Sequence, residues 1–176
     1  FFLPPRVILE LWEAKMNEVL TLREQLAFHL SGRGAHIDFG AAVDQLPFDL
    51  TGVQVPNLAH TAWQLVYHLQ IAQRDILEFC RNPAHRSPEY PSGYWPESPA
   101  PESEQQWLGM IESFRVDLKD LVDLVEDPDN DLFAPFAHGS GQNLLREAIL
   151  IIDHNSYHIG QLVDIRMLLE APVRDW

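Results

Sequence analysis

Two histidines near the carboxyl end of the chain have the spacing of a pair of metal ligands. His154 and His158 are one helical turn apart, so on a helix their Cβ atoms lie about 5 to 6 Å apart and about 40° around the axis. Imidazoles at this spacing can converge on one ion, with nitrogen-to-metal distances of about 2.0 to 2.1 Å. Gln161 extends the same polar face. The pattern indicates a site for one divalent metal ion.

The pair interrupts an apolar stripe, which gives a physical reason to expect a ligand there. The stripe also includes Asn155, and its apolar members are Leu144, Ala148, Ile151, Leu162, Ile165 and Leu169. Buried polar groups without partners cost about 1 to 3 kcal/mol each. A metal ion or ordered water would satisfy these groups. In the alternative interpretation, the histidines only form hydrogen bonds within the core.

His68 is the third candidate ligand. It lies near the midpoint of a second helical segment and flanks the apolar stripe of that segment. His154 and His158 lie near the midpoint of theirs, and the midpoints of packed bundle helices come level whichever way the helices run. A three-histidine site therefore follows if the two helices are neighbours.

Four segments show helical periodicity, and strand patterns are nearly absent. The expected helices run from about Pro5 to Leu30, from Asn57 to Arg81, from Ser103 to about Glu126 and from Asn143 to Glu170. The apolar stripe of the first segment is Ile8, Leu11, Trp12, Met16, Val19, Leu22, Leu26 and Leu30. The pattern predicts an all-α protein, a four-helix bundle with long interhelical connections.

The connections differ in composition. Residues 33–56 contain glycines and prolines without a sustained period, and we expect this segment to cross the bundle. Residues 83–101 contain six prolines together with Tyr90, Tyr94 and Trp95, which predicts an extended loop without regular structure that could act as a lid.

The helix after residue 102 begins with a recognisable signal. Ser103 and Gln106 form a capping box. The acidic residues of this helix lie off its apolar stripe and are expected to face water; they are Asp117, Asp120, Asp123 and Glu126.

Composition and charge narrow the functional classes. The chain has 176 residues, of which 46% are hydrophobic and 22% charged, and these values predict one globular domain over residues 1–176. A formal net charge of -14 argues against nucleic acid as a partner. The single cysteine, Cys80, cannot form an intrachain disulfide and favours a cytoplasmic location. No apolar run long enough for a membrane span and no signal-peptide pattern is present.

Two segments resemble a known family. Trp63 to Asp75 (WQLVYHLQIAQRD) and Leu145 to Leu169 (LREAILIIDHNSYHIGQLVDIRMLL) are similar to the DinB-like (DinB/YfiT) domains, four-helix bundles often found as dimers with a metal in the core. The resemblance implies that His68, His154 and His158 are the metal ligands and that the chain forms a homodimer. It also implies thiol-dependent transferase or isomerase chemistry on small molecules, in which the metal activates a low-molecular-weight thiol.

Several chemistries stay open at this stage. Three neutral imidazoles leave a coordination position for water, thiolate or substrate, which suits a metal-dependent transferase or hydrolase. The alternative is a non-catalytic module, for binding or stress response, in which the metal braces the bundle. Imidazole suits zinc, nickel, iron and copper alike; we expect zinc or nickel. Candidates for supporting roles around the ligands are Gln64, Asp75, Asn155, Tyr157 and Gln161.

The remaining reactive residues have simpler expected roles, and no catalytic residue is assigned. Cys80 lies among apolar neighbours and is expected to be a packed thiol. Ser156 is adjacent in sequence to other polar residues, which does not establish a catalytic triad. The other histidines, His29, His36, His60, His85 and His138, are expected on the surface or in loops.

Overall fold

The computed structural model describes residues 4–171 and 173, and within these residues the chain is helical without any strand. The side chains of Ile8, Leu11 and Trp12, which belong to the predicted first stripe, lie outside the description. The helices are α1 (Pro5–Leu30), α2 (Phe39–Val43), α3 (Ala62–Arg81), α4 (Glu104–Glu126) and α5 (Leu144–Leu168), with 3-10 turns η1 (Phe48–Leu50) and η2 (Ser92–Tyr94). The all-α prediction is confirmed.

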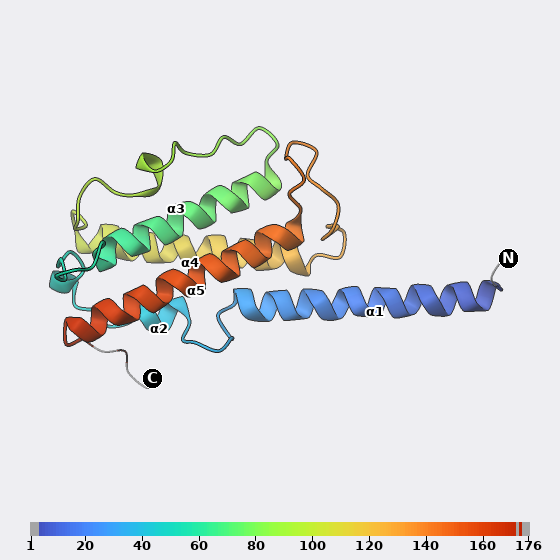
Figure 1. Ribbon diagram of the computed structural model, residues 1–176, viewed down its shortest axis with the longest axis horizontal. Coiled ribbons are helices and arrows are strands. Elements are labelled where there is room, and N and C mark those ends of the chain that lie inside the picture. Colours follow the sequence, from blue (N-terminus) through green and yellow to red (C-terminus); the bar gives the residue numbers. More distant parts are fainter. Residues whose placement is uncertain (1–3, 172, 174–176) are drawn as a thin grey trace.

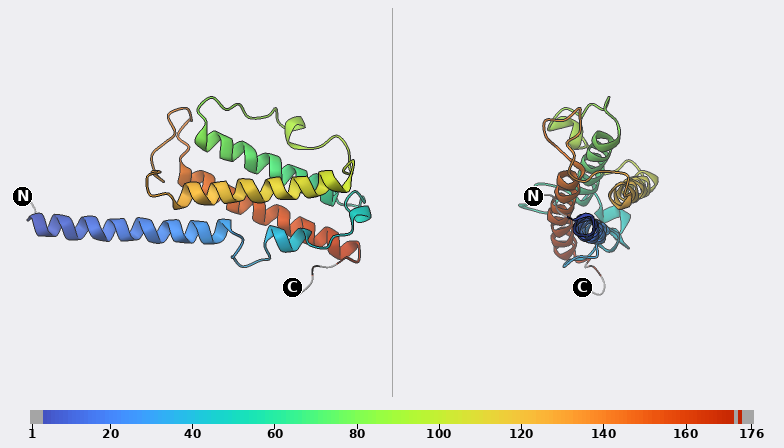
Figure 2. Two further views of the ribbon diagram at one scale, coloured as in Figure 1. Left: turned by 180° about the vertical axis from the view of Figure 1, so that it is seen from behind. Right: turned by 90° about the vertical axis from the view of Figure 1, so that its right-hand side faces the viewer.

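The helices α3, α4 and α5 occupy three positions of a four-position bundle (Figure 1). The fourth position is shared. The carboxyl-terminal part of α1 and the short α2 lie along one line beside α5, with residues 31–38 between them (Figures 1 and 2). The amino-terminal half of α1 extends beyond the bundle (Figure 1). Along this helix, Met16 and Leu20 are exposed.

Two buried arginines fix the two parts of this fourth position. Arg23 of α1 donates hydrogen bonds to the carbonyl oxygens of Val125 and Asn130, where α4 ends. Arg166 of α5 donates to the carbonyl oxygens of Ala42 and Asp44, where α2 ends. Each guanidinium thus satisfies one carbonyl group that a helix terminus leaves without an intrahelical partner, Val125 in α4 and Ala42 in α2, and one in the segment that follows.

The connections differ from the predicted paths. The segment after α1 was expected to cross the bundle, but it continues along the line of α1 as α2 and then turns into α3 (Figure 1). The proline-rich segment after α3 runs the length of the bundle, so that α3 and α4 point the same way. The prediction that this segment lacks regular structure is wrong at Ser92–Tyr94, which form the turn η2.

Capping residues explain where the helices begin. The predicted start of α3 at Asn57 is wrong, because Asn57 has a left-handed φ of 68° and the capping box is formed by Thr61 with Gln64. At α4, Ser103 accepts from the N–H of Gln106, but the Gln106 side chain accepts from the N–H of Glu102, so half of the predicted box is formed.

The last helix ends slightly earlier than predicted. Asn143 caps its start by accepting from the N–H of Arg146. Its last residue is Leu168, and Glu170, the predicted end, has a left-handed φ of 55°. That conformation cannot continue a right-handed helix.

The described residues form two hydrophobic core clusters. One gathers around Trp63, Phe114 and Leu162 and is closed by α2. The other gathers around Leu77 and Ile151 and is closed by the end of α1. The two parts of the fourth bundle position therefore each cover one cluster.

A polar layer lies between the clusters at the middle of the bundle. Gln73 is fully buried on α3 and accepts a hydrogen bond from Asn155 of α5 at 3.0 Å. The Gln73 amide donates to the carbonyl of Phe114 at 2.8 Å. Asp117 of α4 completes the layer, because its carboxylate accepts from Gln70 at 3.1 Å and from Arg74 at 2.7 Å.

The burial of Asp117 corrects one expectation. Its side chain is 1% exposed, whereas it was predicted to face water with the other acids of this helix. Asp123 and Glu126 are exposed and Asp120 is partly exposed, as predicted. Asp117 occupies the helical turn between Phe114 and Leu121, which are both core residues. An apolar stripe read from the sequence does not reveal a carboxylate whose partners come from another helix.

Among the helices of residues 4–171, none is long and apolar enough to cross a lipid bilayer.

The polar layer predicts that substitutions of Asp117 and Asp120, both on α4, change the stability of the protein by different amounts. Asp117→Asn should lower the free energy of unfolding by about 2 to 4 kcal/mol, because it replaces the buried carboxylate that accepts from Gln70 and Arg74 with an amide whose own N–H groups face those donors. Asp120→Asn should lower it by less than about 1 kcal/mol, because its ion pair with Arg81 is partly exposed. Urea unfolding followed by circular dichroism measures both changes, and equal changes would contradict a buried role for Asp117.

Candidate metal centre

The three predicted ligands come together between α3 and α5. One ligand nitrogen from each of His68, His154 and His158 lies within 4.8 Å of the other two. The ring centroids are 4.9 Å apart for His68 and His154, 4.8 Å for His68 and His158, and 4.6 Å for the pair on α5. Helices α3 and α5 pack directly against each other, so the condition on which the three-histidine site depended is met.

The spacing fits one ion after small adjustments. Nitrogens bound at about 2.05 Å in a tetrahedral arrangement are about 3.3 Å apart. The Nε2 atoms of His68 and His154 are 3.0 Å apart, slightly closer than this value, and all three ligand nitrogens lie within 4.8 Å of one another. Rotation of the imidazoles about their side-chain torsions can bring the three nitrogens to a common distance.

The loop before α4 fixes the ring of His68. The Nδ1–H of His68 donates to the carbonyl oxygen of Tyr94 at 3.2 Å, and a carbonyl can only accept. The hydrogen must therefore be on Nδ1, which leaves the lone pair on Nε2. Trp95 stacks on the same imidazole, with centroids 4.0 Å apart and planes 5° from parallel. The predicted lid segment thus contacts the site directly.

Gln161 fixes the ring of His158. The Nδ1–H of His158 donates to the Oε1 of Gln161 at 2.7 Å, so Nε2 again carries the lone pair. Of the predicted supporting residues, Gln161 therefore contacts a candidate ligand as expected. A histidine ligand commonly donates its second nitrogen to an acceptor of this kind, which fixes the tautomer and the ring orientation.

His154 is the ligand whose hydrogen bonding is incomplete. Its Nδ1 and the Oδ1 of the adjacent Asn155 are both buried without a hydrogen-bond partner among the described residues. Without a metal, the Nε2–H of His154 must donate to the lone pair on Nε2 of His68. The Nδ1 of His154 then carries no hydrogen and is an acceptor with no donor near it. With an ion on Nε2, the hydrogen moves to Nδ1, where it can be donated to Asn155. The two unpaired atoms become complementary only when Nε2 is a ligand, so the residues fit a metal ion.

Electrostatics keep the cluster uncharged. Burial, assisted by the charges of His154 and His158, lowers the pKa of His68 to about 4. Burial and the charge of His158 lower the pKa of His154 to about 4, with the Asn155 side chain acting in the opposite direction. Burial also lowers the pKa of His158. Neutral imidazoles are the form that binds metal, so no proton has to be displaced near pH 7.

Asp75, another predicted supporting residue, acts on the site indirectly. It lies two turns beyond His68, about 10 Å along the helix. Its carboxylate instead accepts from Nε2 of His85 at 2.6 Å and from the hydroxyl of Tyr94 at 2.7 Å. Asp75 therefore ties the loop to α3, and the loop presents the Tyr94 carbonyl to His68.

Two further predicted supporting residues, Gln64 and Tyr157, have the following contacts. Gln64 accepts from the backbone N–H of Thr61, because the first turn of α3 has free N–H groups to satisfy. Tyr157 is 65% exposed, and its ring meets the edge of His158 at a centroid distance of 4.9 Å.

His60 is a residue near the site that the sequence reasoning missed. Its ring stacks on Trp95, with centroids 3.9 Å apart, and its charge contributes to the lowered pKa values of His68 and His158. A hollow of about 60 Å³ beside the cluster is lined by His60 and Gln161, among others. His60 lies eight residues before His68, and this closeness in sequence was the one available sign that it belongs to the site. It lies in a loop, however, so no helical period could show which way its side chain points.

Comparisons with protein-family models, curated proteins and solved structures found no match. The resemblance to DinB-like domains therefore stays an expectation from sequence, and the site is interpreted from its geometry.

Cys80 does not contribute a reactive thiolate. Burial raises the pKa of its thiol to about 12, and the carboxylate of Glu147 acts in the same direction. At pH 8 the thiolate fraction of Cys80 is therefore far below the about one in four of a free cysteine. Any thiol chemistry at the metal centre would therefore use a thiol from solution.

We predict that Cys80 in the folded protein reacts with a disulfide reagent such as 5,5′-dithiobis(2-nitrobenzoate) at least about 100-fold more slowly than a free cysteine at pH 8. The same protein unfolded in urea is the control, because Cys80 is its single cysteine. Equal rates in the two states would contradict the packed-thiol assignment.

Proposed function

We propose that this protein binds one zinc or nickel ion through His68, His154 and His158 and uses it in thiol-dependent transfer chemistry on a small molecule. The observation that supports this best is the hydrogen bonding of the outer nitrogens. The carbonyl of Tyr94 and the amide of Gln161 each hold a hydrogen on Nδ1 and so aim a lone pair of Nε2 at a common point. Two imidazoles that only filled a core would not need the same tautomer.

The number of ligands supports a catalytic role over a closed structural site. Structural zinc sites usually have four protein ligands, whereas the described residues bring three histidines together here. An ion held by three neutral imidazoles retains a position for water or thiolate and lowers the pKa of the group bound there. The role of the protein is to hold the imidazoles neutral and oriented, and to cover one side of them with Trp95.

A thiol from solution is favoured as the co-substrate for two reasons. The resemblance to DinB-like domains implies it, and the only cysteine of the chain has its pKa raised to about 12. Hydrolysis by a bound water is the variant of this proposal that needs no thiol.

A non-catalytic brace is the second candidate, and one observation favours it. The hollow beside the cluster measures only about 60 Å³, which is enough for a water molecule or a sulfur atom but small for a whole substrate. In this alternative the ion links α3 to α5, and the protein acts as a binding or stress-response module.

Metal content tests the ligand assignment. Untagged wild-type protein should contain about one equivalent of zinc or nickel by plasma mass spectrometry, and His68→Ala and His154→Ala should each lose at least about nine-tenths of it. His138→Ala is the matched control, because His138 lies on a loop and bonds the carbonyl of Phe79. A wild-type protein that takes up neither ion on reconstitution would refute the proposal.

Cobalt substitution separates the enzyme from the brace. If a coordination position is open, a low-molecular-weight thiol added to the cobalt(II) protein should produce thiolate-to-cobalt charge-transfer absorption, as expected for a thiolate ligand. Thiol consumption with a panel of small electrophiles should then depend on the metal and on His154. A cobalt spectrum unchanged by thiol, together with no thiol consumption, would favour the brace.

A further inference from the structure

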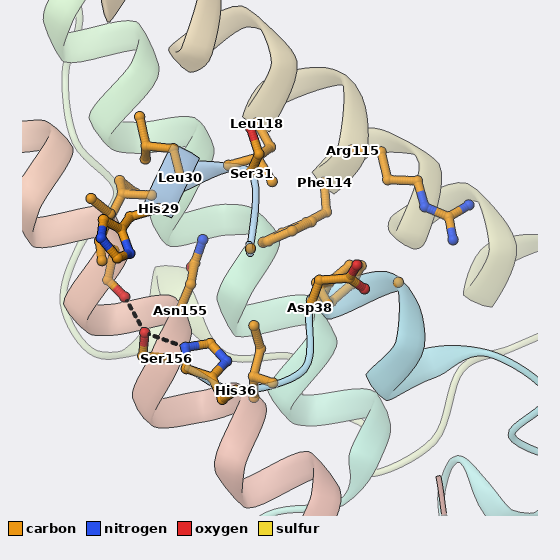
Figure 3. A pocket seen from close by; sticks show the side chains of 16 residues that line it. His29, Leu30, Ser31, His36, Asp38, Phe114, Arg115, Leu118, Asn155 and Ser156 are labelled. Carbon is orange, nitrogen blue, oxygen red and sulfur yellow. Dashed lines mark hydrogen bonds between the residues drawn. The ribbon is translucent and has the colours of Figure 1, made fainter. Parts of the chain in front are cut away.

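The hollow beside the three histidines is too small for a whole substrate. It measures about 60 Å³, whereas a cavity that holds benzene measures about 150 Å³. A larger hollow, of about 230 Å³, lies between the end of α1 and the start of α2 (Figure 3), but none of the three candidate ligands lines it. A substrate that reaches the ligands therefore needs space that a side chain of the protein fills. The large side chain stacked on a candidate ligand is that of Trp95.

Trp95 is held between two imidazoles. Its indole ring stacks on His68 with centroids 4.0 Å apart and planes 5° from parallel, and on His60 with centroids 3.9 Å apart and planes 13° from parallel. Two imidazoles at these distances would collide if they shared one face of the indole, so they lie on opposite faces. The centroid of Trp95 is also 6.3 Å from that of His158. The indole thus occupies a flat slot, one ring thick, beside two of the three candidate ligands.

The walls of this slot do not belong to the loop that fills it. His68 lies on α3, and His60 lies directly before the residue that caps the start of the same helix. Trp95 comes instead from the proline-rich loop, which runs outside the helices along α3 (Figure 1). Its side chain is partly exposed. Movement of the loop therefore empties the slot and leaves both walls in place, without separating the helices.

Polar contacts hold the loop on either side of Trp95. The hydroxyl of Tyr94 donates to Asp75 at 2.7 Å, and the carbonyl of Pro99 accepts from the hydroxyl of Thr61 at 2.6 Å. Water can replace such bonds when a loop opens, so their net contribution to stability is modest. Segments held in this way open far more often than the helices unfold.

We propose that the slot between His60 and His68 binds a flat aromatic ring of the substrate, and that Trp95 occupies it as an internal substitute while the loop is closed. A ring in the slot stacks on both imidazoles, as the indole does. It lies over one candidate ligand and near another, so a group on its edge faces the site. This inference rests on the proposed function in treating the bound ring as part of the substrate.

Indole is the probe, because it reproduces the side chain of Trp95. Cyclohexylmethanol is the comparison compound, since it is similar in size and apolar but not flat. Metal-free Trp95→Ala protein should bind indole saturably, with changes in the ring NMR signals of His60 and His68. It should bind cyclohexylmethanol at least about fivefold more weakly, because a puckered ring cannot stack on both walls. Wild-type protein should bind indole at least about tenfold more weakly than the variant, because the tethered indole competes at a high effective concentration.

Removal of one wall locates the binding. In the Trp95→Ala background, His60→Ala should weaken indole binding at least about fivefold. His138→Ala is the matched control and should leave it unchanged, because His138 bonds the carbonyl of Phe79, at the other end of α3. Equal binding of the two compounds, unchanged binding without His60, or no saturable binding of indole up to about 5 mM would each overturn the proposal.

A second variant keeps Trp95 and tests whether it moves. Tyr94→Phe removes the hydroxyl that bonds Asp75, so the loop should open more often and indole should bind at least about threefold more tightly than to the wild type. Tyr90→Phe is the control in the same loop and should change nothing, because Tyr90 is 78% exposed. Binding no tighter in Tyr94→Phe than in the wild type would contradict the role of Trp95 as a movable substitute. Every measurement uses metal-free protein, so failure of the metal proposal does not affect the result.

Discussion

The polar layer at the middle of the bundle is the constraint on which the rest of the structure depends. Three helices place a polar side chain at a position where the neighbouring turns are apolar, and each unpaired group there would cost about 1 to 3 kcal/mol. The bond from Asn155 to Gln73 and the bonds from Gln70 and Arg74 to Asp117 remove most of that cost. These bonds form only at one relative height of α3, α4 and α5, so the layer sets the register that a uniform apolar core would leave free.

That register determines the geometry of the metal centre. His68 lies just before the layer on α3, and His154 lies beside Asn155 on α5, so pairing Gln73 with Asn155 brings the imidazoles level. A slip of one helical turn, about 5.4 Å, would exceed the separation that one ion can tolerate. The unpaired Oδ1 of Asn155 is then the acceptor that metal-bound His154 needs, so one amide serves both the fold and the site.

The sequence alone predicts the parts of this arrangement that repeat with the helical period. The helix-forming segments, the pairing of His154 with His158 and the break in the core at Asn155 could all be read in this way. Gln73 and Asp117 could not, because whether a polar residue beside a stripe is buried depends on donors from another helix. The stacking of Trp95 on His68, the place of His60 and the interruption after α1 could not be predicted either, since loop residues are positioned by contacts that have no helical period.

The groups that cover the three-histidine cluster determine how a further ligand could reach it. Trp95 closes one face of His68, and the backbone of α3 and α5 closes the sides from which the imidazoles project. The small hollow beside His60 and Gln161 admits a ligand the size of water or a thiol sulfur. A larger substrate requires the loop to move, and Asp75 holds that loop through two hydrogen bonds, to His85 and to Tyr94. Because the Tyr94 carbonyl also orients His68, any movement of the loop that widened the hollow would also release the imidazole of His68.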